Sequence, residues 1–148
     1  MSESKPKTKP FAVQSAAALL IAHGIFMVLD ANSAGRAIGD MSDLPKAVIW
    51  LGVMIFLAGL IFDLQVIAWW LTTMFGGLAG IFLLLRTVGY VMYRSAGLAD
   101  EAVHFSPTFN ALAGVCLLLA SLLLTLPDSK RAFGLTPPVK QDDFNNLP

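Results

Sequence analysis

Charged residues are scarce in this chain of 148 residues: 14% are Asp, Glu, Lys or Arg, whereas 56% are hydrophobic. The surface of a soluble domain carries about 25–35% charged residues, so this composition excludes an ordinary soluble protein. Basic and acidic residues number 10 each, and the formal net charge is zero. Because no basic excess points to nucleic acid, we expect no nucleic-acid partner.

Cysteine and histidine are also rare. The one cysteine, Cys116, excludes an intrachain disulfide and a Cys-based metal site, and its apolar surroundings favour a packing role. Haem or metal binding would depend on His23 and His104, which makes it the least supported function. No metalloprotease motif, phosphate loop or catalytic triad spacing is present. We predict no cofactor, no metal and no catalytic residue.

Four long apolar segments dominate the rest of the chain. Each has roughly the length that crosses a hydrocarbon core of ~30 Å as a helix. We therefore predict an all-α integral membrane protein in which four antiparallel transmembrane helices form a compact bundle. The predicted transmembrane domain is 11–126, between polar tails at 1–10 and 127–148, with spans at about 11–29, 46–62, 66–90 and 107–126.

Residues 30–45, rich in Asp, Asn and Gly, are predicted to form an aqueous loop after the first span. The alternative is a cleaved signal peptide, since small residues at Ala31, Ser33 and Ala34 imitate a cleavage region. The first apolar run is longer than the ~7–15 residues of a signal core, which favours a retained span.

Turn and cap residues mark the starts of the later spans. Pro45 and Pro107 suit the first turn of a helix. The connection at 63–65 is so short that the second and third spans must be antiparallel neighbours. A proton relay is the alternative role for Asp63. The predicted N-caps are Ser42 or Asp43 for the second span, Asp63 for the third and Ser106 for the fourth.

Lys and Arg residues predict the orientation. Six of them lie on the side of the two tails (Lys5, Lys7, Lys9, Lys130, Arg131, Lys140) and four on the other side (Arg36, Lys46, Arg86, Arg94). Both termini are therefore predicted to be cytoplasmic. Aromatic side chains are expected at the two membrane interfaces: Trp50, Trp69, Trp70, Tyr90 and Tyr93.

The third span also carries small residues. Gly76 and Gly80 have the G-x-x-x-G spacing that lets another helix approach closely, and packing within the bundle is favoured over dimerisation. Ala18 and Ala22 have the same spacing in the first span and are a candidate for the matching surface.

Two groups of polar residues lie inside the spans. His23, Arg86 and Asn110 are at similar depth toward the outer leaflet, where they would form a polar pocket with Asp30 or His104 at its rim. The simpler alternative has His23 donating to a helix carbonyl, Asn110 bonding locally and Arg86 extending to lipid headgroups. Hydroxyl and amide groups near the inner leaflet are interpreted as interhelical hydrogen-bonding groups: Gln14, Thr72, Thr73, Ser121 and Thr125.

The third span and its exit, GGLAGIFLLLRTVGYVMYRSAG, joined to a final apolar helix, resemble small bacterial four-helix membrane proteins of unassigned activity. The resemblance implies a bacterial inner-membrane origin and a four-helix fold, and it transfers no catalytic residue. We predict a non-catalytic accessory or assembly subunit whose partners are the bilayer and other membrane subunits or further copies of itself. The alternatives are a small transporter or ligand-binding protein that uses the outer polar cluster, and a redox or quinone-associated anchor.

Overall fold

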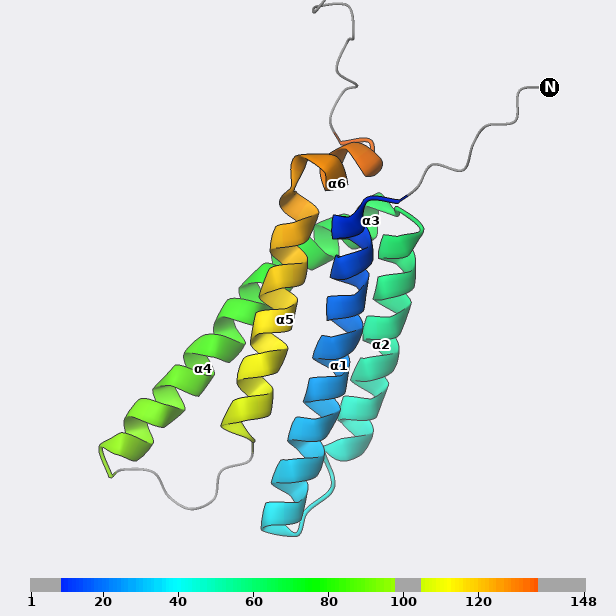
Figure 1. Ribbon diagram of the computed structural model, residues 1–148. Helices are drawn as coiled ribbons and strands as arrows, with labels where there is room; N and C mark the ends of the chain where they lie inside the picture. Colours follow the sequence, from blue (N-terminus) through cyan, green and yellow to red (C-terminus); the bar gives the residue numbers. More distant parts are fainter. Residues whose placement is uncertain (1–8, 98–104, 136–148) are drawn as a thin grey trace, which may run out of the picture.

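The computed structural model describes residues 9–97 and 105–135, and these residues are helical apart from short connections. Four stretches are long and apolar enough to cross a membrane: α1 (Phe11–Ile38), α2 (Leu44–Phe62), the run Val66–Ser95 and α5 (Pro107–Thr125) (Figure 1). The described residues contain no strand. The predicted all-α class with four apolar helices of spanning length is therefore confirmed.

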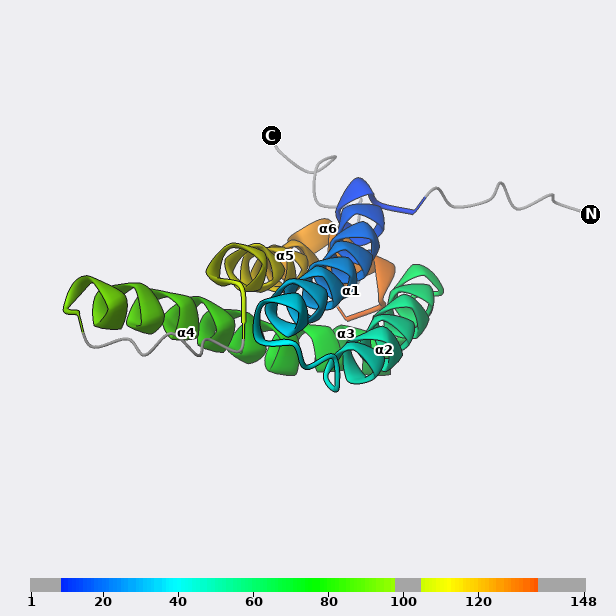
Figure 2. The ribbon, with the colours of Figure 1, turned by 90° about the horizontal axis from the view of Figure 1, so that it is seen from below.

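The third stretch is one helical run of three parts. It begins as α3 (Val66–Trp70), continues as the π-helix η1 (Leu71–Gly76) and ends as α4 (Gly77–Ser95). A π-helical turn inside a long helix commonly redirects it. Figures 1 and 2 show α4 diverging from α1 and α2 after this turn.

Helix α1 packs against both α2 and α5, and α4 packs against α5. Among the described residues, the close backbone packing of α2 with the third span is mainly at α3. The prediction that the second and third spans are neighbours therefore holds at the turn between them and is wrong for α4. The main partner of α4 is the fourth span, because the chain changes direction at η1.

The glycine face of the third span lies against α5. A Cβ atom on Gly80 would be 3.0 Å from the backbone oxygen of Gly114, and one on Gly76 would be 3.3 Å from a leucine side chain of α5. The expectation that Ala18 and Ala22 supply the matching surface is wrong. Ala18 is exposed, and the glycine that meets Gly80 is Gly114. Absent side chains on both helices are what allow this close crossing.

The predicted loop at 30–45 is mostly helical. Helix α1 continues to Ile38 and ends at Gly39, whose φ of 73° is readily adopted by glycine. Asp30 lies within this helix and its carboxylate is buried, where it accepts the backbone N–H of Ser106. Because the carboxylate has this partner inside the protein, the helix continues past the charged residue. Residues 31, 33 and 34, which resembled a cleavage region, are helical.

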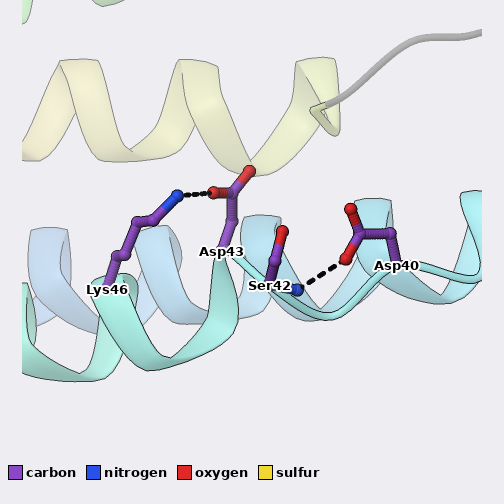
Figure 3. A network of polar contacts seen from close by, with 4 residues as sticks. All are labelled: Asp40, Ser42, Asp43 and Lys46. Atoms are coloured by element: carbon purple, nitrogen blue, oxygen red, sulfur yellow. Dashed lines mark hydrogen bonds and ion pairs between the residues drawn. The ribbon is translucent and has the colours of Figure 1, made fainter.

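The connection from α1 to α2 is stabilised by acidic side chains (Figure 3). The Ser42 N–H donates to Asp40 Oδ1 at 2.9 Å, and Lys46 Nζ donates to Asp43 Oδ1 at 2.6 Å. Pro45 lies in the first turn of α2 as predicted. Neither Ser42 nor Asp43 makes the predicted side-chain cap, since the Asp43 carboxylate accepts from Lys46 instead.

The remaining predicted boundaries are partly right. Gln65, not Asp63, is the residue before the third span, because the chain first turns at Leu64 with a φ of 58°. Ser106 precedes α5 as predicted, but its side chain makes no cap hydrogen bond. The predicted tail begins with a short helix, α6 (Pro127–Ala132), which has proline at its start and basic residues in its last turn.

The Gly80 contact predicts the effect of two matched substitutions. Gly80→Val should lower the free energy of unfolding in detergent by about 1–3 kcal/mol, because its side chain would force two helix backbones apart. Gly89→Val is the control, since a Cβ on Gly89 meets nothing within 4 Å. Unfolding titrations followed by circular dichroism would measure both. Equal stability of the two variants would contradict the close-packing explanation.

Candidate functional site

His23 joins three helices. Its imidazole is 2% exposed, its Nδ1 is 3.0 Å from the Ala113 oxygen of α5, and its Nε2 accepts the indole N–H of Trp50 in α2 at 3.1 Å. Since Nε2 is an acceptor, the proton must be on Nδ1, which donates to Ala113. Both ring nitrogens are thus engaged in a neutral imidazole. Trp50, expected only at a membrane interface, also bonds inward.

Asn110 links α5 to α4. Its side chain is completely buried, and Nδ2 donates to the Leu83 oxygen at 3.0 Å and to Thr87 Oγ1 at 2.9 Å. The alternative of a local bond in the first turn of α5 is therefore wrong, because the amide reaches the neighbouring helix. Its Oδ1 has no hydrogen-bond partner within the described ranges.

Arg86 lies at the end of the bundle near the start of α5. Its guanidinium carbon is 4.0 Å from the ring centroid of Phe105, a cation–π distance. Arg86 and Asp30 line one surface depression, and the Asp30 carboxylate accepts the Ser106 N–H. Tyr90 packs edge-on against Phe105 at 5.3 Å between ring centroids. These contacts tie the ends of α1, α4 and α5 together.

The three predicted polar residues do not form one pocket. His23 bonds between α1, α2 and α5, and Asn110 bonds between α5 and α4. Only Arg86 lines a polar depression of about 310 Å³, and its charged neighbours there are Asp30, Asp43 and Lys46. His104 lies outside the described residues. Asp30 was anticipated at this rim, whereas Asp43 and Lys46 were not.

The inner-leaflet polar groups have mixed roles. Ser121 Oγ donates to the Thr73 oxygen at 3.0 Å, which confirms the predicted interhelical role for Ser121. Gln14, Thr73 and Thr125 instead donate to carbonyls within or next to their own helices. Thr72 Oγ1 is buried and has no partner among the described residues.

An apolar cavity of about 400 Å³ lies between α2 and the third span, where α4 diverges. Its walls come from both helices, and Leu20 and Leu117 also contribute. Thr72, which is 1% exposed, lies in its lining with three other residues of η1. Sequence patterns did not reveal this cavity, because they suggested that the second and third spans would pack side by side.

A second hollow, which we call the small-residue groove, lies between α1 and α2. It measures about 450 Å³ and includes Ala17, Ala18, Ala58 and Gly59 in its lining. Ala18 and Gly59 are exposed, and a Cβ on Gly59 would meet nothing within 4 Å. Of the two alanines noted in the first span, Ala18 thus lies on an open surface.

Metal and haem binding gain no support from the geometry. No group of three His, Cys, Asp or Glu side chains within residues 9–97 and 105–135 is placed to hold a metal ion. His23 would have to break its bond to Trp50 or to Ala113 in order to bind a metal.

The contact between His23 and Trp50 gives a testable coupling. The variants His23→Leu, Trp50→Phe and the double variant should show a coupling free energy of about 1 kcal/mol in unfolding experiments, because each single change removes the same hydrogen bond. Asn110→Leu combined with Trp50→Phe is the control, since these two side chains share no hydrogen bond. Strict additivity of His23→Leu and Trp50→Phe would contradict the bond.

Comparison of the chain with protein-family models, curated proteins and solved structures finds no match. The resemblance to small four-helix membrane proteins therefore stays a prediction. Function has to be argued from the cavities and contacts of the chain itself.

Proposed function

We propose that this protein is a non-catalytic accessory or assembly subunit of a larger membrane complex, and that the small-residue groove receives a transmembrane helix of its partner. The observation that carries this proposal is the open backbone at Gly59, beside the exposed Ala18. Helices in lipid associate by close packing at small residues, because lipid chains are as apolar as leucine side chains.

Three polar side chains within the spans support a structural role. Their hydrogen bonds join helices: His23 to α2 and α5, Asn110 to α4 and Ser121 to η1. Such bonds fix the arrangement of helices and leave few groups for chemistry. Transport through the outer cluster is correspondingly less favoured, since its members point to different interfaces.

We further propose that the protein resides in a bacterial cytoplasmic membrane with both termini in the cytoplasm. Six Lys and Arg residues belong to the tail side and four to the other side, which agrees with the rule that cytoplasmic flanks carry more positive charge. The start of α1 and helix α6 lie at the same end of the molecule (Figure 1).

Photo-crosslinking in the native membrane tests the accessory role. A benzophenone amino acid at position 18 should give one discrete adduct with another membrane protein, whereas the same group at position 89 of α4 should label lipid only. Gly59→Leu should abolish the position 18 adduct by filling the groove, and Gly89→Leu should leave it unchanged.

Two results would contradict the proposal. An adduct of twice the chain's own mass would indicate self-association rather than an accessory role. Labelling of lipid alone at position 18 would show that no protein helix occupies the groove.

A further inference from the structure

We propose that the polar depression beside Arg86 binds the phosphoethanolamine headgroup of a phospholipid. Arg86 binds the phosphate, and the carboxylates of Asp30 and Asp43 accept the primary ammonium. The inference does not depend on the accessory role, because the described linings of this depression and of the small-residue groove share no residue.

The charges of the depression are balanced. Its charged lining residues are Asp30 on α1, Asp43 and Lys46 at the start of α2, and Arg86 on α4. Two cations and two carboxylates in one hollow match a ligand that carries one charge of each sign, since a ligand with a single charge would meet two like charges. The volume of about 310 Å³ is at the lower end of the range for small-molecule sites, which suits a headgroup.

Arg86 is the group that can bind the phosphate. Its guanidinium lies over the Phe105 ring at 4.0 Å from the centroid, which holds it at the rim of the depression. Within the described ranges, none of its five N–H groups has a hydrogen-bond acceptor. A planar guanidinium with open donors is well suited to phosphate oxygens, which it can bind through two parallel hydrogen bonds.

The two carboxylates keep an oxygen available for the ammonium. Asp30 uses Oδ1 to accept the Ser106 N–H, and Asp43 uses Oδ1 to accept from Lys46 Nζ at 2.6 Å. Figure 3 shows Asp43 and Lys46 pointing to the same side of the chain. In each carboxylate, Oδ2 has no hydrogen-bond partner among the described residues. A primary ammonium has three N–H donors and can therefore bind both carboxylates.

The position of the depression favours a lipid as the source of this headgroup. Asp43 directly precedes α2, so its carboxylate lies at the end of a span, where phospholipid headgroups are found. Further into the same spans, α2 and α4 expose apolar side chains such as Val53 and Phe82. One phospholipid molecule supplies the phosphate, the ammonium and acyl chains that would cover this apolar surface.

Native mass spectrometry of the full chain in detergent tests the selectivity. The added probes are phosphatidylethanolamine, phosphatidylcholine and phosphatidylglycerol with identical acyl chains. Wild-type protein should retain phosphatidylethanolamine about three- to tenfold better than phosphatidylcholine, whose trimethylated nitrogen has no N–H to donate to a carboxylate. It should also retain phosphatidylethanolamine better than phosphatidylglycerol, which has the phosphate but no cation.

Two pairs of matched variants assign the residues. Arg86→Gln should lower retention of phosphatidylethanolamine about tenfold, because charge-assisted hydrogen bonds are lost. Arg94→Gln is its control, an exposed arginine of the same helix outside the lining.

Asp43→Asn should shift the preference toward phosphatidylglycerol at least threefold or so, because the depression then has a net positive charge. Asp63→Asn, an exposed carboxylate at the other end of α2, should leave the preference unchanged. Circular dichroism would verify that each variant is folded.

The proposal is overturned if wild type retains phosphatidylethanolamine and phosphatidylcholine equally, if Asp43→Asn leaves the preference unchanged, or if Arg86→Gln has no more effect than Arg94→Gln. Glycerophosphoethanolamine has the same headgroup without acyl chains and should not displace the bound lipid. Its displacement of the lipid at equal concentration would assign the depression to a soluble ligand and overturn the lipid source.

Discussion

The contact between Gly80 and Gly114 fixes the position of the third span. Helix α4 packs closely against α5, so this crossing determines where α4 lies. Because neither glycine has a side chain, the backbones approach until a Cβ atom would be only 3.0–3.1 Å from the facing carbonyl oxygen. Asn110 strengthens the same interface with hydrogen bonds to Leu83 and Thr87. The cavity beside α2 exists because α4 follows α5 rather than α2.

Within the bundle, buried polar groups act as connections between helices. His23 is the clearest case, since one neutral imidazole donates to α5 and accepts from α2. Trp69 adds a bond at the other end, where its indole N–H donates to the Leu124 oxygen of α5 at 2.8 Å. In a medium without water, such groups need partners inside the protein. Two buried atoms of the described residues are exceptions, since neither Thr72 Oγ1 nor Asn110 Oδ1 has a hydrogen-bond partner there.

Local patterns predicted the number and approximate position of the spans, because apolar length is a property of each segment alone. The same reasoning placed Pro45 and Pro107 in first helical turns. It failed at residues 30–38, where a charge that normally marks a loop is buried against the N–H of Ser106, 76 residues away. It also failed for α4, since the choice between α2 and α5 depends on the π-helix and on Gly114. Neither feature is visible in hydropathy.

Helix α2 contributes to both hollows of the molecule. Ala58 and Gly59 face the small-residue groove, whereas Leu57 and Leu60 line the apolar cavity, so adjacent positions serve opposite sides. The close packing of α2 is mainly with α1, with a short contact at α3. Under the proposed accessory role, a partner helix seated beside Gly59 would therefore contact α2 on the side opposite the apolar cavity.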